Sequence, residues 1–150
     1  MTATLTGQPT DRPLFYTKAG PAYLADDIAI GASLGCRYYE GRNGVDVSVA
    51  GYGGFLSEAY ILPSIRYMRM IQPSARQSIH FGIGGGYGRV ETIFTVFHGM
   101  LGHASLGYDL QWGPCHFLLG ADLLQPTIPF DKKVSDTYLP VISLNLGLGF

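Results

Sequence analysis

The feature that most constrains this chain is an alternation of bulky apolar residues with small or polar ones, clearest at its C-terminal end. In TYLPVISLNLGLGF the even positions from 138 to 150 are Tyr, Pro, Ile, Leu, Leu, Leu and Phe. The odd positions include Thr, Ser, Asn and two Gly. Successive side chains of a strand point to opposite faces, so this period of two predicts a strand with one bulky apolar face and one small or polar face.

The same alternation recurs along the chain, separated by turn-forming residues, and no segment has helical periodicity. The connections GRNG (41–44), QPSAR (72–76) and QWGP (111–114) are typical of tight turns. They alternate with connections near 25–26, 54–57, 90–92 and 126–135. We therefore predict an N-terminal tail (1–13) followed by an all-β, antiparallel, up-and-down barrel (14–150). Its eight strands are predicted at 14–24, 27–40, 44–53, 58–71, 77–89, 93–110, 115–125 and 136–150.

Composition excludes several classes of protein. Hydrophobic residues make up 47% of the chain, which excludes intrinsic disorder. The net charge is −1 with no basic run, so we expect no nucleic-acid partner. No uncharged stretch reaches the roughly 18 residues of a membrane-spanning helix. The segment MTATLTGQPTDRP lacks the apolar core of a signal peptide, so we expect either a non-secreted chain or an exported chain whose signal has been removed.

The distribution of charges and glycines over the two strand faces decides which face is inside. A stripe of glycines at positions 82, 84, 86 and 88 lies on the small or polar face, where we expect it to make room for Arg66. Small residues fit the concave interior of a narrow eight-stranded barrel, so the bulky apolar face is the exterior. Apolar outside and polar inside is the pattern of a transmembrane β-barrel. A soluble ligand-binding barrel of lipocalin type, which needs a polar exterior and an apolar cavity, is the alternative.

Over residues 14–150 the chain resembles the small Gram-negative outer-membrane proteins of the OmpA/OmpX-like eight-stranded class. The C-terminal pattern Leu144, Leu146, Leu148 and Phe150 looks like the signal that such proteins present to the outer-membrane assembly machinery. The motif GIGGGYG (82–88) and the tight turns at one end also resemble this class. The resemblance implies a monomer in the bacterial outer membrane, in contact with membrane lipid or lipopolysaccharide. We expect no cofactor.

Three positive and three negative residues lie mid-strand on the predicted interior face. Across the tight turns we expect Arg37 near Asp46, Arg66 near His80, and Asp109 facing His116. Two functions are compatible with these charges: a structural ion-pair network that fills the barrel, or a very narrow porin-like pore. Eight strands leave an interior just filled by side chains, which favours the network. The predicted network comprises Lys18, Arg37, Asp46, Arg66, His80, Asp109, His116 and Asp122.

The pair His103 and Ser105 is the strongest catalytic hint in the sequence. If Asp109 faces His116, then His103 faces Asp122, and a serine, a histidine and an aspartate converge as nucleophile, base and orienting group. The outer-membrane lipid A 3-O-deacylases carry a similar His-x-Ser motif, so a lipid-acting hydrolase is the alternative function. Here the motif faces the interior, where an acyl chain has no access. We therefore expect a non-enzymatic barrel with a structural or surface role.

Four scattered histidines and two distant cysteines give no metal-ligand spacing, so no metal site is expected.

Overall fold

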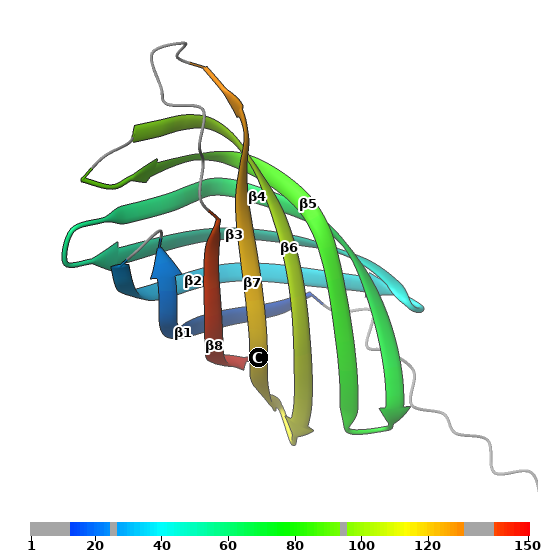
Figure 1. Cartoon of the computed structure of the whole chain (residues 1–150). Coiled ribbons are helices and arrows are strands. Elements are labelled where there is room, and N and C mark those ends of the chain that lie inside the picture. The colour runs from blue at the N-terminus through cyan, green and yellow to red at the C-terminus, as the bar shows by residue number, and fades with distance from the viewer. Residues whose placement is uncertain (1–12, 25–26, 94–95, 131–139) are drawn as a thin grey trace, which may run out of the picture.

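The computed structural model describes residues 13–24, 27–93, 96–130 and 140–150, which form a closed β-barrel (Figure 1). Each strand pairs antiparallel with its neighbours in chain order, and β1 pairs with β8 to close the ring. Among the described residues no helix is long and apolar enough to cross a membrane. The strands are β1 (Leu14–Leu24), β2 (Asp27–Glu40), β3 (Asn43–Gly54), β4 (Glu58–Ser74), β5 (Gln77–Glu91), β6 (Val96–Trp112), β7 (Cys115–Pro129) and β8 (Val141–Gly149).

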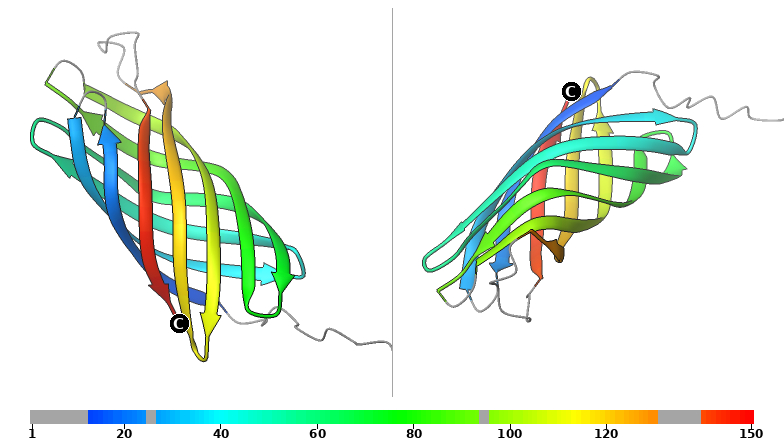
Figure 2. Two further views of the ribbon diagram at one scale, coloured as in Figure 1. Left: turned by 60° about the horizontal axis from the view of Figure 1, so that its bottom comes forward. Right: turned by 90° about the horizontal axis from the view of Figure 1, so that it is seen from above.

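Closure gives every strand two hydrogen-bonded neighbours, so the sheet has no edge strand. The backbone groups of Phe15 and Phe150 exchange two hydrogen bonds, of 3.1 and 2.9 Å, beyond the end of the β1–β8 ladder. An open edge would present a row of unsatisfied N–H and C=O groups. The two views of Figure 2 show the ring from outside, with its strands strongly tilted.

The two ends of the barrel differ. We call the end that carries the tight turns β2–β3, β4–β5 and β6–β7 the short-turn end, and the C-terminus lies there (Figure 2). Gly41 and Gly113 both have φ of 62°, the left-handed conformation that glycine adopts without steric cost. The opposite end, the loop end, carries the remaining connections.

The predicted strands agree closely with the observed ones. The bounds of β1 and β2 are as predicted, whereas β4 and β7 extend three and four residues further than predicted. The predicted tail 1–13 lies outside the described residues except for Pro13, as do positions 136–139 of the last predicted strand. The up-and-down, all-β architecture is confirmed.

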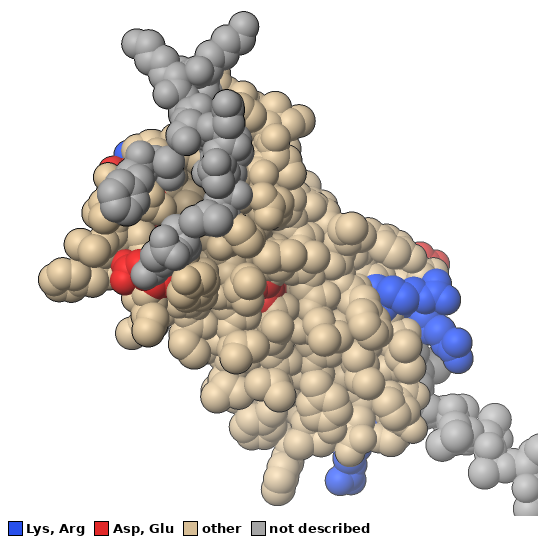
Figure 3. Space-filling model, viewed as in Figure 1, with Lys and Arg blue, Asp and Glu red and all other residues tan. Residues whose placement is uncertain are grey.

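The outer face is apolar as predicted, whereas the inner face is polar at the middle of the barrel and apolar at the loop end. Outward side chains are large, apolar and exposed, for example Ile28 at 78%, Ile83 at 69% and Leu146 at 69%. On the face seen in Figure 3, charged residues gather towards the two ends and the flank between them is almost uncharged. The outward-facing Arg69 and Arg89 lie close to strand ends.

The interior is filled in layers. At the loop end, twelve buried apolar residues from all eight strands pack into one cluster. A layer of charged side chains lies at the middle of the barrel. A smaller apolar cluster near the short-turn end consists of Tyr39, Met68 and Met70. The members of the loop-end cluster are Ala22, Leu24, Ala29, Ala50, Tyr52, Ala59, Ile61, Val90, Phe97, Leu101, Leu124 and Val141.

Two glycines of β5, Gly84 and Gly86, have a different role from the predicted one. A Cβ atom at Gly84 would overlap the carbonyl oxygen of Ile65, and one at Gly86 would overlap that of Pro63. These glycines therefore allow the backbone of β4 to approach closely, rather than making room for the Arg66 side chain. The close approach accompanies a register shift in β4 around Leu62 and Pro63, where proline's missing N–H removes no ladder hydrogen bond.

Candidate functional site

Arg66, on β4, lies at the centre of the interior and is 1% exposed. Its Nη2 donates a hydrogen bond to Asp46 Oδ1 on β3, and its Nη1 donates to Asp122 Oδ1 on β7 at 2.9 Å. One guanidinium therefore connects carboxylates from strands on two sides of the barrel. Its planar fork matches this double task better than a lysine ammonium would.

Two further cations share the same two carboxylates. Lys18 Nζ donates to Asp122 Oδ2 at 3.0 Å, and Arg37 Nε donates to Asp46 Oδ2 at 3.0 Å. Neutral donors complete the coordination: the hydroxyl of Tyr16 donates to Asp46, and the amide of Asn145 donates to Asp122. We call Lys18, Arg37, Asp46, Arg66 and Asp122 the central network. It contains three cations and two carboxylates.

The remaining predicted charges form a second group towards the short-turn end. His116 Nδ1 lies 3.0 Å from Asp109 Oδ1, and His80 Nε2 lies 3.7 Å from Asp109 Oδ2. The hydroxyl of Tyr39 lies 2.7 Å from His80 Nδ1. Among the described residues, Asp109 contacts His80 and His116 and none of the cations of the central network, so this third carboxylate belongs to the histidine group.

The expected register of two hairpins is wrong. The β6–β7 turn closes at Trp112 and Cys115, so it spans two residues instead of the four of QWGP. From this turn up to Leu101, the pairs across the hairpin are therefore shifted by two: His116 faces Gln111, and Asp109 reaches it only diagonally.

Across the β4–β5 hairpin, Arg66 faces Gly84, four positions along β5 from His80. The expected proximity of Arg66 to His80 is therefore wrong, and its guanidinium contacts Asp46, Asp122 and His103 instead.

The same shift changes which candidate catalytic residue faces Asp122, although the predicted contact between His103 and Asp122 is present. Ser105, and not His103, faces Asp122. The Ser105 hydroxyl is buried and has no hydrogen-bond partner among the described residues. His103 Nε2 lies 3.2 Å from Asp122 Oδ1 and 3.0 Å from Arg66 Nη1, while its Nδ1 lies 2.8 Å from Ser64 Oγ. Both ring nitrogens are thus occupied, and Ser105 has no base.

Ser64 is the residue that sequence reasoning missed. Ser64, His103 and Asp122 are in the hydrogen-bonded order of a catalytic triad, but Ser64 is 0% exposed. A nucleophile needs an approach for its substrate, and this one has none. The only sequence signal was the position of Ser64 on the polar face, because the β4 irregularity that brings it to His103 has no signature beyond Pro63.

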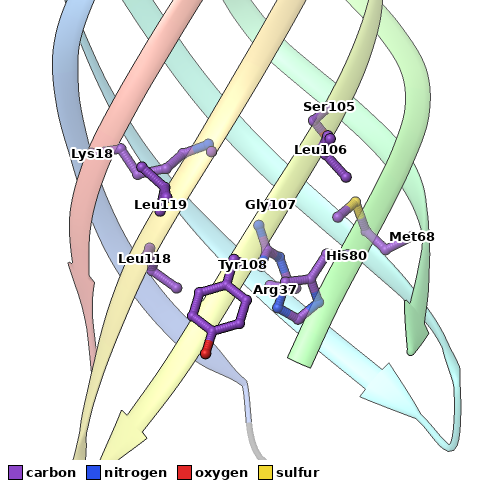
Figure 4. A pocket seen from close by; sticks show the side chains of 11 residues that line it. Lys18, Arg37, Met68, His80, Ser105, Leu106, Gly107, Tyr108, Leu118 and Leu119 are labelled. Atoms are coloured by element: carbon purple, nitrogen blue, oxygen red, sulfur yellow. The ribbon is translucent and has the colours of Figure 1, made fainter. Parts of the chain in front are cut away.

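Cavities lie among the described residues near the short-turn end of the interior. A cavity of about 20 Å³ lies among Lys18, Arg37, His80 and Ser105 (Figure 4). A larger one, of about 400 Å³, opens among the turn residues and Phe150. We call the larger cavity the vestibule; its polar lining includes Arg37, Tyr39, His80, Asp109, Gln111 and His116. Within the described ranges, no cluster of three or more His, Cys, Asp or Glu side chains is arranged to hold a metal.

The predicted assembly signal lies on the outer surface of the last strand. Leu144, Leu146 and Leu148 on β8 are exposed and alternate with buried or partly buried residues. Phe150 follows directly and is 73% exposed. All four side chains therefore face outwards.

Comparisons with known proteins agree on the fold. No protein-family model matches the chain, and no curated protein sequence matches it. Neisserial surface protein A superposes with a TM-score of 0.68 at 8% identity, covering 91% of this chain and 94% of that one. The N-terminal β-barrel domain of Pseudomonas aeruginosa OprF gives 0.56 at 12% identity, covering 91% and 97%. The Yersinia pestis outer membrane protein Ail, in a phospholipid bilayer nanodisc, gives 0.51 at 17% identity, covering 93% and 100%.

Proposed function

We propose that this chain is a bacterial outer-membrane β-barrel with a structural or surface role and no enzymatic activity. The observation that carries the proposal is the closed ring whose outer flank is apolar and almost uncharged, while the charged side chains of its strands are buried at the middle of the interior. Exposure of such a flank to water is unfavourable, whereas its contact with lipid hydrocarbon is favourable. In lipid, a closed ring also lets the strands satisfy each other's backbone hydrogen bonds. The fold shared with Ail, a protein described in a phospholipid bilayer, supports the same location.

The filled interior supports a structural role rather than conduction. Arg66, Phe97 and Leu101 are each at most 2% exposed and lie at successive levels of the barrel. An ion crossing the barrel would have to displace both the loop-end apolar cluster and the charged layer. Breaking buried ion pairs costs several kcal/mol each. The central network therefore serves to fix the strands around it.

Two partners follow from the same features. The exposed apolar flank is the surface that contacts membrane lipid or lipopolysaccharide. The outward-facing series Leu144, Leu146, Leu148 and Phe150 is the part we propose the outer-membrane assembly machinery recognises. The chain functions as a monomer in this account, because closure within one chain satisfies every strand.

The proposal is tested by refolding the protein into phosphatidylcholine vesicles. We expect it to float with the vesicles, to resist alkaline extraction, and to give no ion conductance in planar bilayers. Protein that stays in the aqueous fraction would refute the membrane location. Steady single-channel conductance would refute the structural role and favour the pore.

A further inference from the structure

The central network holds one positive charge more than its carboxylates neutralise. Lys18 and Arg66 share Asp122, while Arg66 and Arg37 share Asp46. Taking an unbalanced charge out of water is costly unless another group compensates it. Asp109 is held between His80 and His116, and no contact joins it to these cations among the described residues.

Arg37 is where this excess charge meets an open space. Its side chain is 7% exposed, and only its Nε is used, to bond Asp46. Its guanidinium also lies over the ring of Tyr16, with Cζ 5.2 Å from the ring centroid. Among the described residues no acceptor bonds its two terminal nitrogens, and the residue lines both cavities. Four N–H donors of a nearly buried guanidinium are therefore left for a group in the vestibule.

We propose that the vestibule binds a small organic oxyanion, a carboxylate or a phosphate ester, on the terminal nitrogens of Arg37. A guanidinium and such an oxyanion form paired, charge-assisted hydrogen bonds of good geometry. The volume of about 400 Å³ exceeds what a bare oxyanion needs, so the ligand carries an organic substituent. Met70 and Leu14 supply apolar lining for it.

The surroundings limit where the oxyanion sits. Asp109 lines the same cavity and repels a negative charge, but His116 and His80 lie against its two carboxylate oxygens. The anionic group therefore lies on the Arg37 side, and the substituent extends towards the opening. Arg76, exposed in the β4–β5 turn and also lining the vestibule, attracts anions to that opening. This site is independent of the proposed structural role of the barrel.

The test is to titrate ligands into the whole chain, refolded in an uncharged maltoside detergent, and to monitor binding by changes in NMR chemical shifts. Benzoate and phenyl phosphate are the probes, and benzamide is the neutral counterpart of benzoate. We expect saturable binding of at least one anion, with shifts at Tyr39, His80 and Gln111, and about tenfold or more weaker binding of benzamide. The stronger of the two anions identifies the oxyanion.

Arg37→Lys keeps the charge but loses the planar fork, so we expect it to weaken binding of the anion about tenfold or more. Arg89→Gln, near the loop end, is the matched control and is expected to bind like the unaltered protein. Absence of saturation with both anions, equal binding of benzamide, or unchanged affinity in Arg37→Lys overturns the proposal. If Arg37→Lys does not fold, the unaltered protein still provides the test. Anion-induced chemical-shift changes centred on residues outside the vestibule would then overturn the proposal.

Discussion

At the scale of single residues, the interior depends on a few side chains with many partners. Asp122 accepts hydrogen bonds from Lys18, Arg66 and Asn145 and contacts His103. These residues come from five different strands, β1, β4, β6, β7 and β8. A single carboxylate thus links strands that are far apart in the chain.

Asp122→Ala is expected to lower the free energy of unfolding by about 3–5 kcal/mol, because it leaves Lys18 and part of Arg66 buried without their counter-charge. Urea unfolding in lipid vesicles, followed by the change in gel mobility between folded and unfolded protein, measures this. A loss below about 1 kcal/mol would mean that water or rearranged partners satisfy these cations.

Ser105→Ala, at the position that faces Asp122 on β6, is expected to have a much smaller effect than Asp122→Ala. Its hydroxyl is buried without a partner among the described residues, so its removal is expected to change the free energy of unfolding by less than about 1 kcal/mol. Ester hydrolysis by detergent-solubilised protein should be absent before and after the change. An esterase activity that Ser105→Ala abolishes would contradict the structural assignment of this residue.

At the scale of elements, strands and faces follow from the sequence, whereas pairing across hairpins follows only in part. The proximity of Arg37 to Asp46 could be derived, because a short turn around Gly41 joins their strands. The β6–β7 register could not, since QWGP is compatible with both a four-residue connection and a two-residue turn. That difference of two keeps every side chain on its predicted face. It nevertheless exchanges the neighbours, and so Ser105 instead of His103 faces Asp122.

The close approach of β4 and β5 predicts a strong contrast between two glycines. Gly84→Ala places a methyl group against the carbonyl oxygen of Ile65, so we expect a loss of about 1–3 kcal/mol or more in the free energy of unfolding. Gly51 has nothing within 4 Å of an added Cβ, and Gly51→Ala is expected to be tolerated. Equal effects of the two substitutions in the same unfolding assay would refute the role assigned to the β5 glycines.

Asp27 holds the β3–β4 connection at the loop end. Its Oδ2 accepts hydrogen bonds from the Leu56 backbone N–H and the Ser57 hydroxyl, both at 2.8 Å. The Leu56 N–H, followed by the Ser57 hydroxyl, lowers the pKa of Asp27 below its usual 3.8. Because these hydrogen bonds stabilise the charged form of Asp27, their contribution to stability is fully present above pH 3.8 and is lost as the pH falls through the lowered pKa.

We therefore expect Asp27→Ala to accelerate hydrogen exchange of the Leu56 amide at neutral pH, while Asp27→Asn, which keeps an acceptor, has a smaller effect. Exchange measured residue by residue in detergent provides the comparison. Identical Leu56 exchange in all three proteins would show that Asp27 does not hold this connection.

At the scale of the whole molecule, the alternation of side chains and the narrowness of an eight-stranded ring together determine which face is outside. Because so narrow an interior is crowded, the face with glycines and charges had to be inside, and the structure agrees. The two cavities and the unused donors of Arg37 could not be predicted, since they depend on how tilted strands bring distant side chains together. Ser64 is a similar case, because only the irregular segment at Leu62 and Pro63 turns it towards His103.

The central claim is that the apolar flank of this closed barrel faces lipid. Size-exclusion chromatography with light scattering, with and without detergent, tests it most directly. We expect one folded chain per detergent micelle, and aggregation when detergent falls below its critical micelle concentration, because the exposed apolar flank then meets water. A folded, monodisperse monomer in detergent-free buffer would contradict the claim and favour the soluble barrel.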